Sequence, residues 1–320
     1  MSDEQILVGT LENKINTKAG YIAIIGMPNV GKSTLMNVLV GAKLSIVTSK
    51  PQTTRKRVLG ILTEKNTQMI FLDTPGILNP KYKMQNLMMD YVYNSIEEAD
   101  CLVFIYDITK YNSDRYSNSK GFPIQHLKLL REINKKYSAK NIILILNKID
   151  LLKDRKELLP IIAAVNELQI FSDIIPISAL KKSNVNEIFL TIPKYLPYSN
   201  FYYDPELLST QPERFFVSEI IRENIFLSYS DEIPYSTEIN IIDFKEREFG
   251  KWYIGAEIIV EKQTQKGIII GKKGEKLKKV MQKSRRSIEE HLQMPIYLDI
   301  FVKVRAKWRD NSNLLRSYDY

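Results

Sequence analysis

The chain has 320 residues, of which 44% are hydrophobic and 10% aromatic, so we expect a globular protein of two domains, not a fibrous or disordered one. Its single cysteine, Cys101, excludes an internal disulfide, and its two histidines, His126 and His291, lie far apart in sequence, which disfavours a zinc site. The formal net charge is +9, and one segment, 262–286, has ten basic residues against one acidic residue, which indicates a polyanionic partner. The polar first residues and the lack of a long apolar run predict a cytoplasmic protein with no signal peptide and no transmembrane segment.

Five short apolar runs in the first two-thirds of the chain predict the strands of one sheet. The runs are continuous, not alternating, as in parallel strands that are covered on both faces. Helical stretches are expected between them, for example at 33–40 and 124–136. The pattern is typical of an α/β fold with a doubly wound, mostly parallel sheet. The predicted strands are Tyr21–Ile25, Met69–Leu72, Leu102–Tyr106, Asn141–Leu146 and Ile174–Ile177.

A phosphate-binding loop follows the first predicted strand and opens the first predicted helix. Its sequence, GMPNVGKS, matches the pattern GxxxxGKS/T in the context that this pattern requires. Glycines let backbone N–H groups wrap around an anion, Lys32 can reach the β- and γ-phosphates, and Ser33 can ligate Mg²⁺. The expected nucleotide-binding residues of this segment are Gly26, Met27, Pro28, Asn29, Val30, Gly31, Lys32, Ser33 and Thr34.

Two later segments are expected at the same phosphates. Thr53 and Thr54 lie before the second strand, where a threonine can ligate Mg²⁺ when the γ-phosphate is present; Thr54 is slightly favoured, and the sequence does not separate the pair. In Asp73-Thr74-Pro75-Gly76, the Asp73 carboxylate can hold Mg²⁺ through water and the Gly76 N–H can contact the γ-phosphate. The expected catalytic residues are Lys32, Thr54, Asp73, Gly76 and Asn29.

The stretch Asn147-Lys148-Ile149-Asp150 closes the fourth apolar run and predicts a guanine site. Asp150 can accept hydrogen bonds from both N1–H and the exocyclic amine of guanine, whereas adenine offers neither donor in that arrangement. The Lys148 stem can lie against the ring. Ser178 and Ala179 follow the next strand and supply a backbone N–H for guanine O6. Together these residues predict binding of GTP and GDP instead of the adenine nucleotides.

Four prolines within 193–212 interrupt the α/β pattern and predict a linker. Behind it we expect a helix at 213–227, strands at 238–244, 251–261 and 296–304, and a basic helix punctuated by glycines, in an order similar to the α-β-β-α-α-β of a type II KH domain. The C-terminal segment, with Trp308, is expected to pack on this second unit. The expected divisions are a polar tail (1–18), a nucleotide domain (19–198), a linker (199–212), a KH-type domain (213–305) and a C-terminal tail (306–320).

The basic segment 262–286 contains a GxxG loop, Gly271-Lys272-Lys273-Gly274. KH domains clamp about four single-stranded nucleotides at such a loop, because glycines admit the sugar-phosphate backbone and lysines neutralise it. We expect residues 267–274 to lie between a strand and a helix, with Ile269 and Ile270 in an apolar groove under the bases. The expected RNA-binding residues are Gly267, Ile269, Ile270, Gly271, Lys272, Lys273, Gly274, Lys276, Lys279 and Arg285.

The ordered motifs resemble those of the Ras-like GTPase superfamily and, in detail, the bacterial Era family. The resemblance spans about residues 20–315; PQTTRKR (51–57), DTPGI (73–77), QPERFFVSEIIREN (211–224), the GKKG segment and VKVRAKWRDN (302–311) are its main carriers. It implies binding to the 3′ end of small-subunit ribosomal RNA, with the maturing small ribosomal subunit as partner. Intrinsic hydrolysis is expected to be slow, because Ile77 stands where Ras-type proteins have a water-orienting glutamine. The stretch 110–120 is more polar than the family pattern and is interpreted as a surface loop.

The resemblance also indicates potassium. GTPases with Asn at the position of Asn29 often bind K⁺ between this residue and the phosphates, so K⁺-stimulated hydrolysis is a hypothesis alongside the Mg²⁺ requirement. Two other classes of function stay open. One is a GTP-dependent docking protein whose basic segment binds anionic lipid at the inner membrane surface, or a protein partner. The other is an RNA-binding structural protein with a vestigial nucleotide site. A monomer is expected.

Overall fold

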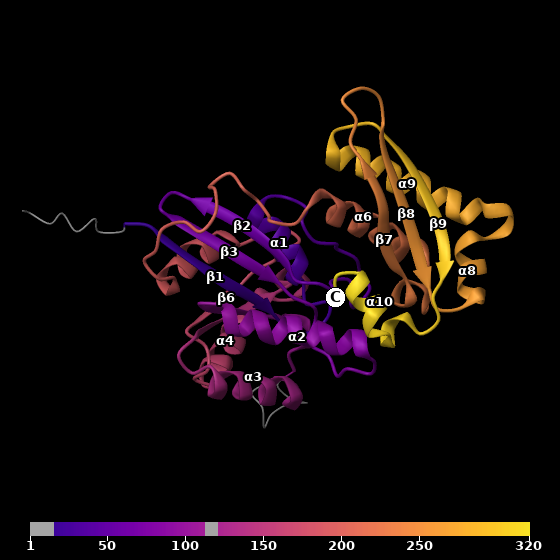
Figure 1. Cartoon of the computed structure of the whole chain (residues 1–320). Coiled ribbons are helices and arrows are strands. Elements are labelled where there is room, and N and C mark those ends of the chain that lie inside the picture. Colours follow the sequence, from indigo (N-terminus) through magenta and orange to yellow (C-terminus); the bar gives the residue numbers. More distant parts are fainter. Residues whose placement is uncertain (1–15, 113–120) are drawn as a thin grey trace, which may run out of the picture.

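The computed structural model describes residues 16–112 and 121–320, which form two sheets with their helices (Figure 1). The first sheet has six strands in the order β2-β3-β1-β4-β5-β6. Only β2 and β3 pair in antiparallel fashion; the other neighbours are parallel. The predicted doubly wound, mostly parallel α/β fold is confirmed. The strands are β1 (Lys18–Ile25), β2 (Val58–Glu64), β3 (Thr67–Asp73), β4 (Cys101–Asp107), β5 (Asn141–Asn147) and β6 (Asp173–Pro176).

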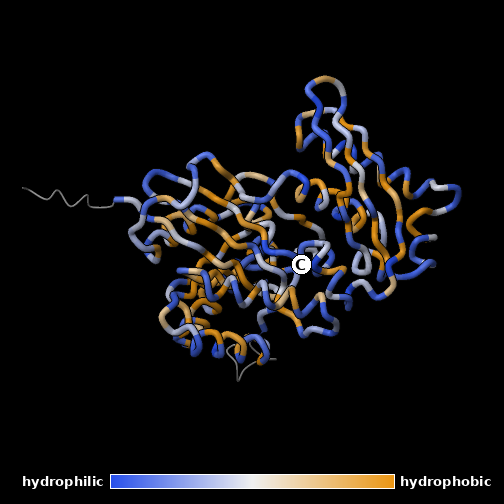
Figure 2. The backbone as a smooth tube through the Cα atoms, viewed as in Figure 1, coloured by the Kyte–Doolittle hydropathy of each residue, from blue (hydrophilic) through white to orange (hydrophobic). Residues whose placement is uncertain are grey.

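Helices cover both faces of this sheet. Because side chains of a strand alternate between faces, Ile22 and Ile24 of β1 belong to the core under α1 (Lys32–Val40) and α5 (Asn186–Thr191). Ala23 and Ile25 belong to the core under α2 (Lys83–Glu98), α3 (Ile124–Lys136) and α4 (Leu158–Asn166). The hydrophobic stretches of the chain therefore follow the inner strands (Figure 2). The five predicted strands and two predicted helices are confirmed; the edge strand β2 and the methionine-rich α2 were not predicted.

The second sheet has the order β7-β8-β9, with β7 antiparallel and β9 parallel to β8. Its core contains Val217 and Ile221 of α6, Ile269 of α8 and Ile288 of α9, so these helices pack on one face of the sheet. The predicted strands and the α-β-β-α-α-β order are confirmed. The elements are α6 (Glu213–Ser228), α7 (Ile233–Ser236), β7 (Glu238–Lys245), β8 (Trp252–Val260), α8 (Gln263–Ile270), α9 (Glu275–Leu292) and β9 (Ile296–Val304).

The proline-rich stretch at 199–212 lies along the edge of the first sheet. Ile61 N in β2 donates to Leu208 O at 2.8 Å, and Gln68 Oε1 in β3 accepts from Tyr202 N at 2.8 Å and Tyr203 N at 3.0 Å. The first contact satisfies a backbone N–H of the outermost strand, β2, that would otherwise be unpaired, and the other two hold the stretch against the Gln68 side chain of β3. The expected linker is thus an ordered cover for the sheet edge.

The C-terminal segment packs between the two units. Trp308 is fully buried and its Nε1 donates to Ser236 O of α7 at 3.0 Å. On the other side, Lys83 N at the start of α2 donates to Asp310 Oδ1 at 3.0 Å, and α10 (Ser312–Ser317) lies beside α2 (Figure 1). The segment therefore packs on the second unit, as predicted, and also on the first, which was not predicted.

Some sequence-based expectations fall on residues that the structure does not describe, namely 1–15 of the polar tail and 113–120 of the surface loop. Across residues 16–112 and 121–320, no helix has the length and apolar character needed to cross a membrane.

Candidate functional site

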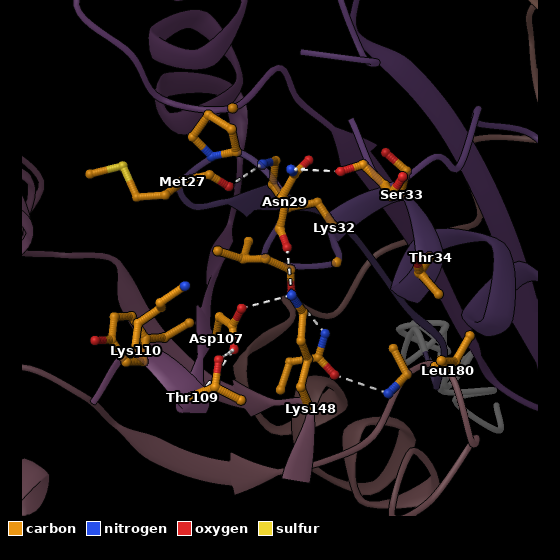
Figure 3. A pocket seen from close by; sticks show the side chains of 18 of the residues that line it. Met27, Asn29, Lys32, Ser33, Thr34, Asp107, Thr109, Lys110, Lys148 and Leu180 are labelled. Atoms are coloured by element: carbon orange, nitrogen blue, oxygen red, sulfur yellow. Dashed lines mark hydrogen bonds and ion pairs between the residues drawn. The ribbon is translucent and has the colours of Figure 1, made fainter. Parts of the chain in front are cut away.

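A cleft of about 1130 Å³ opens where the parallel strands end (Figure 3). Such a position is typical of ligand sites in doubly wound sheets, because the loops that follow the strands meet there. Five of the predicted nucleotide residues lie buried beneath it instead: Gly26, Asp73, Thr74, Pro75 and Ser178. Those that line it are Met27, Pro28, Asn29, Val30, Gly31, Lys32, Ser33, Thr34, Thr53, Thr54, Gly76, Asn147, Lys148, Asp150 and Ala179.

The phosphate loop has a backbone that only glycine can adopt at two points. Gly26 and Gly31 have φ values of 151° and 102°. A Cβ atom at Gly26 would lie 2.5 Å from Ile105 O, and one at Gly31 would lie 2.3 Å from Asn147 Nδ2. The loop therefore packs directly on the ends of β4 and β5 and carries the first turn of α1, whose N–H groups favour anions.

Lys32 is buried and its ammonium group lies over this loop. Lys32 Nζ donates to Met27 O at 2.9 Å and to Gly26 O at 3.1 Å. Burial lowers the pKa of Lys32 to about 8, and the negative charge of Asp73 partly opposes this shift. A phosphate group in the loop would favour the charged form of the ammonium.

Three side-chain oxygen groups gather next to Lys32. Ser33 Oγ donates to Asp73 Oδ2 at 2.7 Å and lies 2.7 Å from Thr54 Oγ1. Asp73 is fully buried, and its Oδ1 has no hydrogen-bond partner within the described part of the chain. Burial raises the pKa of Asp73, while the Ser33 hydrogen bond and the Lys32 charge lower it. Hard oxygen donors around a carboxylate with a spare oxygen fit Mg²⁺, and the geometry favours Thr54 over Thr53 as the third donor.

At the far end of the cleft, the Asn147 side chain joins two loops. Its Nδ2 donates to Val30 O at 2.8 Å and its Oδ1 accepts from Ala179 N at 3.0 Å. Ala179 N–H, expected at guanine O6, is thus engaged by Asn147. Asp150 is exposed at the cleft, and the described residues offer it no hydrogen bond or ion pair. Its carboxylate is therefore free to accept from a ligand.

Sequence reasoning missed Asp107, the last residue of β4. Asp107 Oδ2 pairs with Lys148 Nζ at 2.7 Å (Figure 3), and its Oδ1 accepts from Thr109 N at 3.1 Å and Thr109 Oγ1 at 2.7 Å. Lys148 Nζ also donates to Asn29 O at 2.8 Å. A carboxylate at the end of an apolar run was the available signal, because the ends of parallel strands share one edge.

The candidate RNA-binding loop joins α8 to α9. Gly271 and Gly274 have φ values of 72° and 80°. A Cβ atom at Gly274 would meet nothing within 4 Å, whereas one at Gly271 would lie 2.7 Å from Lys276 Cγ, so the backbone is open to a close approach at Gly274. Lys272 and Lys273 between them are exposed, as are the expected contacts Gly267, Lys276 and Lys279. Arg285 is half-buried and pairs with Glu289.

Two expectations about this region are wrong. Residues 267–270 do not follow a strand but form the end of α8. Ile269 is fully buried in the core of the second unit, and its carbonyl accepts from Tyr229 Oη at 2.8 Å. Its side chain therefore supports the sheet and is not available to a base, while Ile270 is half-buried at the loop.

Comparisons with known proteins match a family model to each of the two units. A family model described as a 50S ribosome-binding GTPase matches residues 21–148, and a KH domain model matches residues 232–309. The chain is 40% identical to the GTPase Era of Clostridium kluyveri over 305 residues, which cover 95% of this chain and 99% of that protein. It is 42% identical over 307 residues to a chloroplastic GTPase ERA-like protein of Oryza sativa subsp. japonica, covering 95% of this chain and 70% of the other.

Two solved structures have a closely similar fold. One is a variant of Era from Aquifex aeolicus bound to GDP·AlF4−, and the other is Era in complex with MgGDPNP and nucleotides 1506–1542 of 16S ribosomal RNA. Each has a TM-score of 0.87 and 37% sequence identity over 94% of this chain, and the matches cover 99% and 98% of those chains. On this shared length, fold and order of motifs, the chain belongs to the Era family of GTPases.

Proposed function

We propose that this GTPase acts as a switch in the assembly of the small ribosomal subunit, binding single-stranded ribosomal RNA at its GxxG loop under the control of the bound nucleotide. The observation that carries the proposal is the meeting of Ser33, Thr54 and Asp73 beside the buried ammonium of Lys32. Thr54 lies in the irregular segment between α1 and β2, whereas Ser33 and Asp73 lie at the ends of regular elements. A ligand that requires Thr54 therefore changes the order of that segment.

Each residue of the cleft has a distinct task in this proposal. Loop N–H groups and Lys32 bind the phosphates, and Gly76 N–H contacts the γ-phosphate. Ser33, Thr54 and Asp73 hold Mg²⁺, which neutralises charge on the phosphate oxygens when it is bound. Asp150 reads guanine, and Asn147 and Lys148 position the loops around it. Ile77 lies where it cannot orient water, since its N–H donates to Gly26 O at 3.1 Å and its apolar side chain packs on the core.

The RNA part of the proposal rests on the second unit. Its exposed lysines stand at a loop that admits a phosphate backbone, at the N-terminal end of the basic helix α9. The solved complex of Era with 16S ribosomal RNA, at 37% identity, supports the 3′ end of small-subunit RNA as the target here. The expected domain divisions, 19–198 and 213–305, correspond to these two tasks.

The test uses the full chain with a single-stranded oligonucleotide of the 3′ end of small-subunit RNA and a scrambled control. Wild-type protein should hydrolyse GTP with Mg²⁺, and Lys32→Ala should lower turnover by roughly 10²-fold or more while the RNA is still bound. Equal turnover of Lys32→Ala and wild type would contradict the catalytic assignment. Binding to anionic vesicles, with no preference for the ribosomal oligonucleotide, would instead favour a membrane-docking protein.

We also propose that K⁺ stimulates hydrolysis and that the chain acts as a monomer. Asn29 is exposed in the cleft, and its Nδ2 donates to Ser49 O of the Thr54 segment at 3.0 Å, so it stands between the phosphate loop and that segment. Turnover should be faster in K⁺ than in Na⁺ at equal ionic strength. Equal rates would exclude the potassium site, and a dimer mass in light scattering would exclude the monomer.

A further inference from the structure

The segment that contains Thr54 is attached to the second unit by basic side chains. Lys43 pairs with Glu223 of α6 at 2.6 Å, and Lys50 Nζ donates to the carbonyls of Phe226 and Tyr229 at the end of the same helix. Arg55 and Lys56 reach α7, β7 and the C-terminal segment. Four cations within 14 residues thus bind one face of the second unit, and their contacts are not equivalent.

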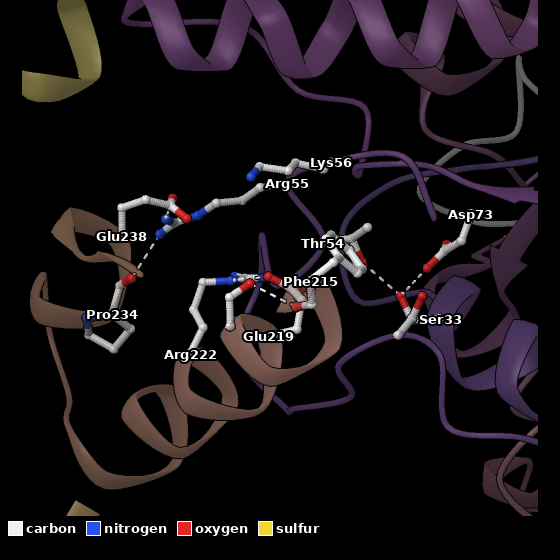
Figure 4. A network of polar contacts seen from close by, with 12 residues as sticks. Ser33, Thr54, Arg55, Lys56, Asp73, Phe215, Glu219, Arg222, Pro234 and Glu238 are labelled. Carbon is white, nitrogen blue, oxygen red and sulfur yellow. Dashed lines mark hydrogen bonds and ion pairs between the residues drawn. The ribbon is translucent and has the colours of Figure 1, made fainter. Parts of the chain in front are cut away.

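Arg55 is the most deeply buried of the four, with its side chain only 3% exposed. Its Nη1 donates to Thr237 O at 2.6 Å and to Glu238 Oε2 at 3.0 Å, and its Nη2 donates to Pro234 O at 2.8 Å (Figure 4). A planar guanidinium matches such a fork of acceptors, and the compact ammonium of lysine does not. The contact therefore fixes both the position and the orientation of Arg55.

The residue before Arg55 is the candidate magnesium ligand. Thr54 Oγ1 lies 2.7 Å from Ser33 Oγ, and Arg55 extends to the opposite side, into the second unit (Figure 4). Consecutive Cα atoms are about 3.8 Å apart across a rigid peptide unit, so the backbone of Thr54 cannot move freely while Arg55 is held. The two sites are therefore mechanically linked by one peptide bond.

Glu238, which binds Arg55, has a second partner from the C-terminal segment. Tyr320 Oη donates to Glu238 Oε2 at 2.7 Å, and Lys56 Nζ lies 4.9 Å from the centre of the Tyr320 ring. Lys56 Nζ also donates to Tyr318 O. The C-terminal segment thus contacts both Glu238, which accepts from Arg55, and Lys56, the residue after Arg55.

We propose that Arg55 is a positioning residue for GTP hydrolysis, which holds Thr54 at the magnesium site through its contacts with the second unit, and that Tyr320 supports it by orienting Glu238. This inference rests on the proposed function, because it requires Thr54 to act as a ligand. Anything that pulls α7 and β7 away from the first unit would withdraw Thr54 from the triphosphate site. By linkage, a bound triphosphate would hold the two units together.

The experiment compares the affinity of full-length variants for GDP and for a non-hydrolysable GTP analogue, both with Mg²⁺. Because Thr54 acts only with a γ-phosphate, Arg55→Lys should lower the affinity for the analogue roughly tenfold and the affinity for GDP by less than about twofold. Tyr320→Phe is a milder change and should lower the affinity for the analogue by a smaller factor. Lys43→Ala is the matched control, since Lys43 is 61% exposed, joins the same two units and lies 11 residues before Thr54; both affinities should be unchanged.

A double-mutant cycle separates this role from a general effect on folding. If Arg55 acts through Thr54, Arg55→Lys should cause no further loss of analogue affinity in a Thr54→Ala background. In nucleotide-free protein, hydrogen exchange of the amides of residues 52–56 should be faster in Arg55→Lys than in Lys43→Ala.

Additive losses of analogue affinity in the cycle, or equal losses of affinity for GDP and for the analogue, would contradict the positioning role of Arg55. Neither result would contradict the assignment of the magnesium site. If Thr54→Ala alone leaves the preference for the analogue unchanged, the ligand assignment itself fails, and this inference fails with it. Should Arg55→Lys not fold, unchanged affinities in Tyr320→Phe would count against the proposal.

Discussion

Lys148 Nζ lies 2.7 Å from Asp107 Oδ2, and this ion pair connects the loop after β5 to the end of β4. The same ammonium donates to Asn29 O at 2.8 Å. One half-buried cation therefore connects the phosphate loop, the loop after β5 and the end of β4. The Lys148 backbone is left-handed, with φ 70°. Lys148, whose stem is predicted to lie against the guanine ring, therefore also connects three segments of the site.

Asp107→Asn tests whether this ion pair supports nucleotide binding. The amide retains an oxygen for Thr109 but loses the charge opposite Lys148, so we expect GTP and GDP to bind roughly tenfold more weakly, with their ratio unchanged. Titration with fluorescent nucleotides measures both affinities. The matched control is Asp154→Asn, because Asp154 also caps a short helical turn, accepting from Lys156 N at 2.9 Å, and does not line the cleft. Unaltered nucleotide binding in Asp107→Asn would show that the ion pair is dispensable.

Asp150→Asn tests the choice of base. Because the Asp150 carboxylate is exposed and has no partner in the described structure, its replacement should leave the fold intact. The asparagine amide can donate to the C2 carbonyl of xanthine and no longer accepts two protons from guanine. We expect GTP affinity to fall by about 10²-fold or more and XTP affinity to rise correspondingly. Competition binding with GTP, XTP and ATP gives the ratios, and a variant that still prefers GTP would refute the assignment of Asp150.

The phosphate contacts of the second unit are tested by salt dependence. Replacing both Lys272 and Lys273 by glutamine should weaken binding of single-stranded RNA and reduce the slope of log K against log salt by about 1.4, since each phosphate contact on a single strand contributes roughly 0.7. Lys135→Gln with Lys136→Gln on α3 removes the same charge elsewhere and should leave the slope unchanged. GTP affinity should be equal in both double variants. An unaltered slope in the Lys272 and Lys273 variant would place the RNA elsewhere.

Much of the nucleotide site could be predicted from the sequence because its determinants are local. Glycine conformations, the lysine and serine of the phosphate loop and the polar ends of apolar runs are all short-range features. The ion pair of Asp107 and the hydrogen bonds of Asn147 join residues more than 30 positions apart. A local pattern could therefore have pointed to Asp107 at the end of its apolar run, but not to the partners of either residue. The sequence also does not show which threonine lies near Ser33, so it did not distinguish Thr53 from Thr54 as the magnesium ligand.

The error at Ile269 has a different cause. Three isoleucines in succession suit a buried strand as well as a helix, because a short apolar run has no diagnostic period. In the structure Ile268 is 43% exposed while Ile269 is fully buried, as expected on successive positions of a helix at a surface. No prediction from the sequence covered the cationic residues at 43–56. The buried acceptors that Arg55 requires come from residues more than 170 positions later, so no local pattern indicates them.

The buried pair of Arg55 and Glu238 predicts a pH dependence of stability. Burial alone would raise the pKa of Glu238, but the charges of Arg55 and Lys56 outweigh it and hold the pKa below its ordinary value of 4.5. A carboxyl with a lower pKa in the folded state than in the unfolded state stabilises the fold above the unfolded value, and this contribution is lost as the pH falls through the folded pKa. The free energy of unfolding of wild type should therefore exceed that of Glu238→Gln by a constant amount above about pH 5 and approach it on further acidification. Urea unfolding at a series of pH values between 3 and 7 measures the difference, and a gap that stays constant down to pH 3 would mean that the charge of Glu238 does not hold the two units together.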